Sequence, residues 1–193
     1  MLTIENKVVE NVHVFGLEDS VRASKYPMAV DTKECTSEVT PRVIALGQSD
    51  RGSGHDQFLT GIVVQFDLTF SIKAWVEAER YHFLDFVSSQ STMHRITKLD
   101  PYKQCNEYVD EEAIRLIKRK IDFYNSNPTP EGYLGVLYNV PVGFMLTARM
   151  TTNYRQLKTI YHQRWNHRLP EWRQFCDWIK TLPYAKELII GEE

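Results

Sequence analysis

Four residues in the C-terminal third of the chain have the spacing of one helix face, and two of them could bind a ligand. They are Asn153, Leu157, Tyr161 and Arg164, at intervals of four, four and three residues, and such intervals place side chains on one side of a helix. An unpaired buried charge is costly, so an arginine in this stripe needs a partner. It pairs with a core carboxylate, extends to solvent, or lines a cavity for a planar polar ligand, which its rigid fork of donors would suit.

A second group of polar residues lies near the middle of the chain. Arg80 and His82 precede the serine- and glutamine-rich stretch Ser89–Ser91, and Arg95 follows it. Upstream, Gly52–Asp56 is glycine-rich but matches neither G-x-G-x-x-G nor the P-loop, and the serines lack the glycines of a nucleophile elbow. Residue types alone therefore indicate neither an activated serine nor a phosphate-binding loop.

The composition of the 193-residue chain argues against several functional classes. Its formal charge of −2 provides no basic surface for general nucleic-acid binding, although a single nucleotide needs only a few cations. The histidines form no H-E-x-x-H motif and the cysteines form no C-x-x-C pair. We therefore predict no metal site.

Cysteine usage and the N-terminus indicate where the protein resides. Cys35, Cys105 and Cys176 are odd in number and far apart, which argues against a disulfide framework and for a reducing compartment. Residues 1–7 lack the apolar core of a signal peptide, and no apolar run approaches the roughly 18 residues of a membrane span. We expect a single cytoplasmic domain over residues 1–193 that does not enter a membrane.

Two alternating stretches predict the strands that must position the polar residues. In 62–70 apolar and polar side chains alternate, and the run 144–151, which follows Pro141, does the same. Residues 7–15 predict a further strand that ends at Gly16. Strands mixed with helices indicate an α+β fold, in which helices flank an antiparallel sheet.

Capping residues and apolar stripes predict the helices. Ser71 is the expected cap of one helix, and Thr151 or Thr152 is the expected cap of another that runs from about Asn153 to Trp165. Gln48–Gly54 is expected to be a loop. The other expected helices and stripes are Leu17–Ala23, the helix after Ser71 (Ile72, Trp75, Val76, Phe83 and Phe86), a helix opened by Asp110 and ended by 125–130 (Ile114, Ile117, Ile121 and Tyr124), and Glu171–Ile179.

Taken in order, these features resemble the flavin-dependent thymidylate synthases. That family has a Gly-His-acid turn, an Ile-Val-x-x-Phe strand, and a helix that leads to an Arg-His-Arg motif. Here the turn is Gly54-His55-Asp56, and the motif counted without gaps falls on Arg80-Tyr81-His82. The family also has a proline, eleven residues, Asn-x-Arg, eight residues and a further arginine, and the corresponding positions are Pro141, Asn153, Arg155 and Arg164.

The sequence departs from the family at several arginines. Only Arg80 remains of the two that flank the signature histidine. Met93 and Leu137 stand where the family has arginines that hold the nucleotide phosphate, and Arg95 is a nearby cation that could substitute in part. Two alternatives to a thymidylate synthase therefore remain: a relative that modifies another pyrimidine, and a non-catalytic nucleotide- or flavin-binding homologue.

The resemblance implies a homotetramer with FAD bound across a subunit interface. In such an enzyme NADPH is the reductant, and methylenetetrahydrofolate supplies the carbon that converts dUMP to dTMP. Arg164 would bond and polarise the pyrimidine edge, which makes it the implied catalytic residue. We predict that it shares a pocket with Ser91 or Arg95. The implied flavin contacts are His55, Arg80, His82, Asn153 and Arg155, and the implied nucleotide contacts are Ser89, Gln90, Ser91, Arg95 and Arg164.

Overall fold

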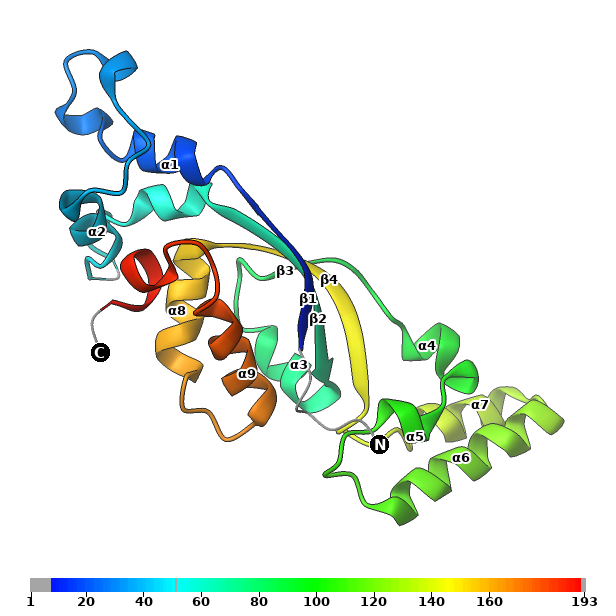
Figure 1. Ribbon diagram of the computed structural model, residues 1–193. Helices are drawn as coiled ribbons and strands as arrows, with labels where there is room; N and C mark the ends of the chain where they lie inside the picture. The colour runs from blue at the N-terminus through cyan, green and yellow to red at the C-terminus, as the bar shows by residue number, and fades with distance from the viewer. Residues whose placement is uncertain (1–7, 51, 192–193) are drawn as a thin grey trace.

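The computed structural model describes residues 8–50 and 52–191, and an antiparallel sheet forms its centre (Figure 1). The inner pair, β2 and β4, is in continuous register from Val63 opposite Asn153 to Ser71 opposite Met145. Helices flank the sheet, which confirms the predicted α+β fold. The strands, in their order across the sheet, are β1 (Val9–Phe15), β2 (Val63–Ser71), β4 (Met145–Asn153) and β3 (Asp85–Ser89).

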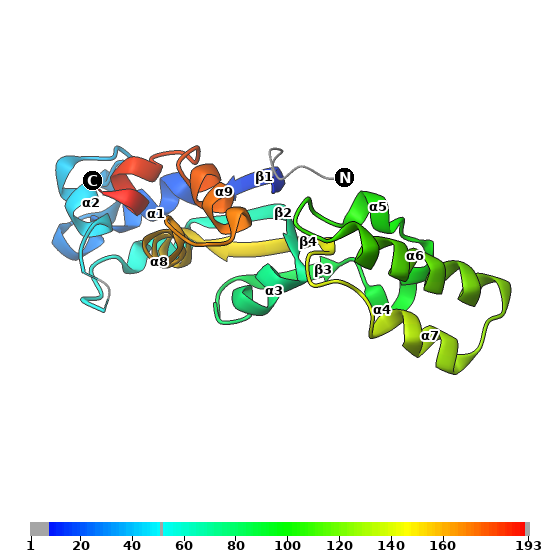
Figure 2. The ribbon, with the colours of Figure 1, turned by 90° about the horizontal axis from the view of Figure 1, so that it is seen from below.

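One face of the sheet carries the main hydrophobic core. In β2 every second side chain from Val64 to Phe70 is buried, as the alternation predicts. Two helices, α8 (Tyr154–Arg164) and α9 (Pro170–Ile179), lie on this face (Figures 1 and 2). The ring of Phe70 packs edge-on against Trp172 of α9, with 4.9 Å between centroids. Both helices were predicted from their stripes, and both are confirmed.

The start of α8 differs from the prediction by one residue. The side-chain oxygen of Asn153 accepts a hydrogen bond from the backbone N–H of Gln156 at 2.9 Å, so Asn153 is the N-cap. Thr151 and Thr152 were wrongly predicted as caps because β4 continues through both of them, where Thr152 pairs with Val64. A cap needs a backbone that has already left the ladder.

A second, smaller core lies in the helices at one end of the sheet (Figure 2). The predicted helix after Asp110 is confirmed, and the Asp110 carboxylate accepts the N–H of Glu112 at 2.8 Å. The helices here are α4 (Thr92–Arg95), α5 (Pro101–Gln104), α6 (Glu111–Ser126) and α7 (Pro130–Leu137), and their core comprises Ile96, Cys105, Ile114, Ile117, Ile121, Val136 and Phe144.

The helix after Ser71 is shorter than predicted. α3 (Ile72–Ala78) ends before Phe83 and Phe86, and Val76 is exposed. Phe86 lies instead in β3 and packs on Trp75, with 5.0 Å between ring centroids. Phe83 and Phe86 have helical spacing but do not continue α3, because the segment that contains Phe86 pairs with the edge of β4. Tertiary pairing of this kind outweighs local propensity.

The N-terminal part packs beside the C-terminal turn and the start of α8. The predicted helix α1 (Leu17–Ala23) is confirmed, whereas α2 (Pro41–Gly47) was not predicted. The predicted loop Gln48–Gly54 is confirmed at its described residues, and Arg51 lies outside them. The expectation of no signal peptide concerns residues 1–7, which also lie outside the described residues. Shorter elements are the 3-10 turns η1 (Tyr26–Met28), η2 (Thr32–Glu34), η3 (Gln57–Gly61) and η4 (Ile96–Lys98), and the π-helical turn η5 (Lys186–Ile190).

The described helices can also be compared with the thickness of a bilayer. Among residues 8–50 and 52–191, no helix is both long enough and apolar enough to cross a membrane. The longest of them, α6, has charged side chains along most of its length and buries only one stripe.

Candidate functional site

Two adjoining cavities run along α8 and form the candidate site. The larger has a volume of about 430 Å³ and the smaller about 300 Å³. They share three lining residues, Phe83, Gln156 and Thr159. We call the pair the α8 cavities, and together they form a groove between α8 and the segment that joins α3 to β3.

Five of the predicted site residues line the α8 cavities. Asn153 and Arg155 line the larger one, and Arg80, His82 and Arg164 line the smaller one. The fold thus brings together two segments that lie more than seventy residues apart in the sequence. The remaining lining residues were not predicted from the sequence, and they are Gln57, Thr60, Tyr81, Phe83, Gln156, Thr159 and Gln163.

Only the two end residues of the predicted stripe, Asn153 and Arg164, line the cavities. Leu157 and Tyr161 of that stripe are buried in the core. The cavities are lined instead by Arg155, Gln156 and Thr159, with Asn153 and Arg164 at the two ends. The periodicity therefore located the helix correctly, but its apolar face packs on the sheet and the neighbouring face borders the cavities.

Arg155 is held in place by a buried carboxylate. Its Nε lies 3.0 Å from Asp56 Oδ1, and one terminal nitrogen donates to Gln57 Oε1 at 2.8 Å. Asp56 is fully buried and also faces Lys158 Nζ, at 3.2 Å. Lys158 donates further hydrogen bonds to the backbone carbonyls of Gly47 and Ser49, at 2.8 and 2.6 Å.

This cluster of Asp56, Arg155 and Lys158 joins the glycine-rich loop to the first turns of α8. A buried charge of either sign is tolerated only with such partners. The sequence did not predict that Asp56 and Lys158 form a buried ion pair. Lys158 lies next to Leu157 of the predicted stripe, but its spacing from that stripe does not indicate that it is buried.

Arg164 lies in an ion pair, not in a pocket with Ser91 or Arg95. One terminal nitrogen is 2.8 Å from Glu77 Oε2, and Nε donates to the Tyr81 hydroxyl at 2.7 Å. The guanidinium also stacks over Trp172, 4.9 Å from the ring centroid. The predicted pocket was therefore wrong, because Glu77 in the last turn of α3 offers the counter-charge that a buried arginine requires.

His167 completes the polar network around Glu77. Its Nδ1 accepts the N–H of Leu169 at 3.2 Å, and its Nε2 lies 3.1 Å from Glu77 Oε2. A terminal nitrogen of Arg164, which can only donate, also lies 2.8 Å from this Nε2. Burial lowers the pKa of His167, and the nearby Arg164 lowers it further, while Glu77 acts in the opposite direction.

The other predicted site residues lie away from the α8 cavities. None of His55, Ser89, Gln90, Ser91 and Arg95 is among the described residues that line them. His55 is exposed in its loop. Figure 1 shows β3 leading away from α8 toward α4, which is where the nucleotide residues predicted from the resemblance are found.

The buried thiols have little nucleophilic character. Burial raises the pKa of Cys105 to about 11, and burial together with the adjacent Asp177 raises that of Cys176 to about 12. A thiolate is the reactive form of cysteine, so these two residues are inert near neutral pH. Among residues 8–50 and 52–191, no cluster of three or more His, Cys, Asp or Glu side chains could hold a metal ion.

Comparison with known proteins places this geometry in a known fold. No protein-family model and no curated protein matches the chain. A solved structure of the flavin-dependent thymidylate synthase ThyX from Helicobacter pylori, complexed with FAD and dUMP, superposes with a TM-score of 0.72. The alignment covers 94% of this chain and 98% of that one, at 13% identity. The fold is that of a flavin-dependent thymidylate synthase.

A second solved structure supports the same assignment. It is also ThyX from Helicobacter pylori with FAD and dUMP, and it superposes with a TM-score of 0.70 at 14% identity, covering 94% of this chain and 97% of that one. The fold that the sequence resemblance implied is therefore confirmed over nearly the whole chain.

Proposed function

We propose that this protein binds FAD and a pyrimidine nucleotide and catalyses the reductive methylation of dUMP to dTMP. The observation that carries the proposal is the set of residues along the α8 cavities. Arg80, His82, Asn153 and Arg155 come from the two segments that resemble flavin-dependent thymidylate synthases, and they line one groove in a chain with that fold. NADPH as reductant and methylenetetrahydrofolate as carbon donor complete the proposal.

The residues of the α8 cavities suit a planar ligand with polar edges. The Phe83 side chain is 61% exposed and provides an aromatic surface at the point where the two cavities meet. The amides of Gln156 and Gln163 and the guanidinium of Arg155 provide hydrogen bonds around it. FAD supplies hydride-transfer chemistry when it is bound, and the protein supplies orientation and electrostatics.

Three of the charged or polar side chains at the cavities, those of Asn153, Arg155 and Arg164, are held by partners within the chain. Asn153 uses its carbonyl oxygen as the helix cap, so its amide N–H groups remain to donate to a ligand. Asp56 holds Arg155, and Glu77 holds Arg164. Preorganised donors of this kind stabilise charge that develops during a reaction, and polarising the pyrimidine is the role we propose for Arg164.

The proposed site is shared between subunits of a homotetramer. Ser89, Gln90, Ser91 and Arg95 lie on the β3–α4 side of the chain, away from its own α8 cavities. A second copy is therefore needed if these residues are to contact the same ligand. Exposed apolar side chains at the β3 edge, Phe86 among them, support association there.

Absorbance spectroscopy and complementation test the proposed function. We expect the purified full chain to bind FAD and show a flavin absorbance band, to convert dUMP to dTMP with NADPH and methylenetetrahydrofolate, and to support growth of a thymidine-requiring strain. Flavin binding with turnover of another pyrimidine would favour the first alternative. Flavin binding without turnover would favour the non-catalytic homologue, and the absence of both flavin and nucleotide binding would refute the proposal.

A further inference from the structure

Gln156 places a nearly buried amide without a partner at the junction of the two α8 cavities. The residue is 9% exposed, and it lines both cavities. Its backbone N–H bonds to the cap residue Asn153 at 2.9 Å, but no described group bonds to its side-chain Oε1 or Nε2. Buried polar groups normally have such partners, and an unpaired one is costly. The amide of Gln156 therefore indicates a ligand that bonds to it.

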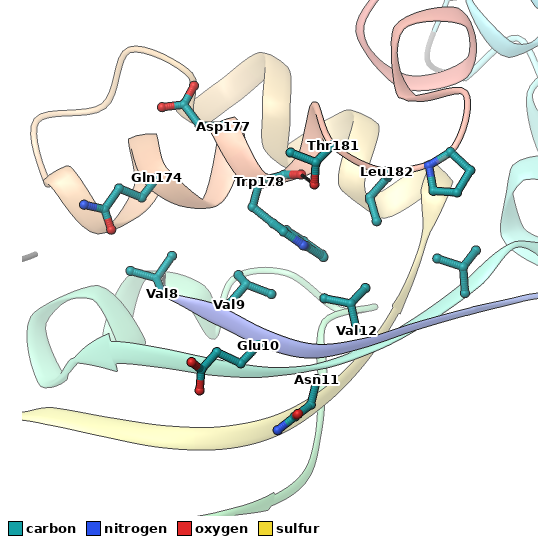
Figure 3. Close-up of a pocket in the computed structure, with 12 residues that line it drawn as sticks. Val8, Val9, Glu10, Asn11, Val12, Gln174, Asp177, Trp178, Thr181 and Leu182 are labelled. Atoms are coloured by element: carbon teal, nitrogen blue, oxygen red, sulfur yellow. Dashed lines mark hydrogen bonds between the residues drawn. The ribbon is translucent and has the colours of Figure 1, made fainter. Parts of the chain in front are cut away.

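A ligand in the cavities can reach this amide. In the described part of the chain, the side-chain atoms that lack a partner and have less than 1 Å² of exposed surface are Glu171 Oε2, Trp172 Nε1 and Gln174 Oε1. Gln156 is not among them, so both its amide atoms retain exposed surface at the cavities. The hollow of about 840 Å³ between β1 and α9 (Figure 3) differs in this respect, because the oxygen of its Gln174 is sealed off.

The other three amides at the cavities offer a ligand mainly donors. Their carbonyl oxygens are already bonded within the chain: Asn153 Oδ1 to the backbone N–H of Gln156, Gln57 Oε1 to Arg155, and Gln163 Oε1 to Tyr81. The Tyr81 hydroxyl accepts from Arg164 Nε at 2.7 Å and donates its own hydrogen to Gln163 at 3.1 Å. The described lining also includes three arginines, which only donate, and no Asp or Glu. Donors are therefore in excess around Gln156.

The amide of Gln156 differs because its donor and its acceptor are both unused and lie side by side. Such an amide can form two parallel hydrogen bonds with a ring lactam, whose carbonyl oxygen and N–H also lie side by side. A trans peptide group cannot pair in this way, because its carbonyl and N–H point in opposite directions. The excess of donors suits a second carbonyl on the other side of the same N–H. A ring with carbonyl, N–H and carbonyl in sequence is a cyclic imide.

We propose that Gln156 binds the imide edge of a planar heterocycle that packs against Phe83, which lines both cavities as well. Gln156 Oε1 accepts the imide N–H and Nε2 donates to one carbonyl, while the neighbouring donors, Gln163 among them, bind the second. Because the isoalloxazine ring of FAD and the uracil ring of dUMP both carry this imide, the role of Gln156 rests on the proposed function. Gln156 thereby determines specificity, since it rejects rings whose imide nitrogen bears no hydrogen.

Titration of the full chain with FAD and with FAD methylated at the imide nitrogen, N3, tests this role. dUMP and its N3-methyl derivative form a second pair. We expect the methyl group to weaken binding of the ligand that Gln156 contacts by about tenfold or more, because Gln156 Oε1 is left buried without its donor. A loss with FAD assigns the flavin ring to Gln156, and a loss with dUMP assigns the pyrimidine.

Gln156→Met should weaken the unmethylated ligand by a similar factor. In this variant the methyl group should have little further effect, because the pair that it disrupts is already absent. The thermal midpoint of the variant should not fall, since the replaced amide has no partner within the described chain. Gln174→Met is the matched control, because Gln174 lines the β1–α9 hollow and neither α8 cavity, and it should bind both ligands like the wild type.

Two results would overturn the role of Gln156 and leave the proposed function intact. One is equal binding of the methylated and unmethylated forms of both ligands by the wild type, a comparison that does not depend on the folding of any variant. The other is a methyl effect that persists undiminished in Gln156→Met. Failure of the wild type to bind either FAD or dUMP would overturn the proposed function and the role of Gln156 together.

Discussion

At the scale of single residues, Arg164 already has within its own chain the contacts that a ligand would provide. Its guanidinium has an ion pair with Glu77, a hydrogen bond with Tyr81 and the face of Trp172. Its side chain is only 10% exposed. We therefore expect Arg164 to contribute mainly to the stability of the fold. If it also contacts a ligand, it does so while Glu77 holds its guanidinium in place.

We expect Arg164→Ala to lower the free energy of unfolding by about 3–5 kcal/mol, because the change leaves the Glu77 carboxylate buried without its main counter-charge. The matched control is Arg22→Ala, which removes an exposed ion pair with Asp19 and should cost less than about 1 kcal/mol. Urea denaturation of the ligand-free proteins measures both. Equal stability of the two variants would contradict the structural role of Arg164.

A pH dependence follows from His167. Its pKa in the folded protein is lowered from the ordinary value of 6.5, so the unfolded chain binds a proton that the folded chain resists. Stability should therefore rise with pH between the lowered value and 6.5, and be lost as the pH falls through that window. Thermal midpoints across this range, compared with those of His167→Gln, measure the contribution. The thermal midpoint of His167→Gln should vary less with pH than that of the wild type. An equal variation in the two proteins would contradict the proposed contribution of His167.

At the scale of elements, the sequence was most informative where periodicity and burial coincide. β2, β4, α6, α8 and α9 were predicted because each buries one regular face. β3 was not, because its side chains are all exposed and its pairing depends on the edge of β4. The position of the cavities beside α8 could not be predicted either. Residue spacing does not indicate which face of a helix the neighbouring segments leave uncovered.

Two helices that were not predicted, α2 and α7, nevertheless have local sequence signals at their N-termini. Thr40 and Thr129 cap α2 and α7, and each is followed by a proline at the first helical position. Proline there both fits the helix and has no N–H that needs a partner. Pro130 was interpreted only as the end of the preceding helix, although the same residue begins the next one.

The attachment of α8 to the glycine-rich loop gives a prediction for a pair of variants. Asp56→Asn should destabilise the protein by about 3–5 kcal/mol, because Lys158 remains buried without its counter-charge. Lys158→Met should cost less, since Asp56 keeps Arg155 as a partner. Urea denaturation compares the two. A larger loss for Lys158→Met would show that the hydrogen bonds to the loop carbonyls, and not the ion pair, hold the loop to α8.

At the scale of the whole molecule, the separation of the β3–α4 residues from the α8 cavities predicts assembly. We expect light scattering to give the mass of four chains. Val87→Lys at the β3 edge should reduce that mass, because a charge on an edge strand opposes pairing, whereas Val30→Lys on an exposed loop should not. A monomeric wild-type protein at micromolar concentration would contradict the shared site.

The central claim is that the α8 cavities form the flavin site, and titration of the full chain with FAD tests it most directly. Thr159 lines both cavities, so Thr159→Trp should weaken FAD binding by about tenfold or more, with Thr159→Met as a smaller block if the first variant does not fold. Thr181→Trp, at a position after α9 that lines neither α8 cavity, should bind FAD like the wild type. Saturable FAD binding that Thr159→Trp weakens and Thr181→Trp does not is the predicted result. FAD binding that is absent, or indifferent to Thr159→Trp in a folded protein, would contradict the account.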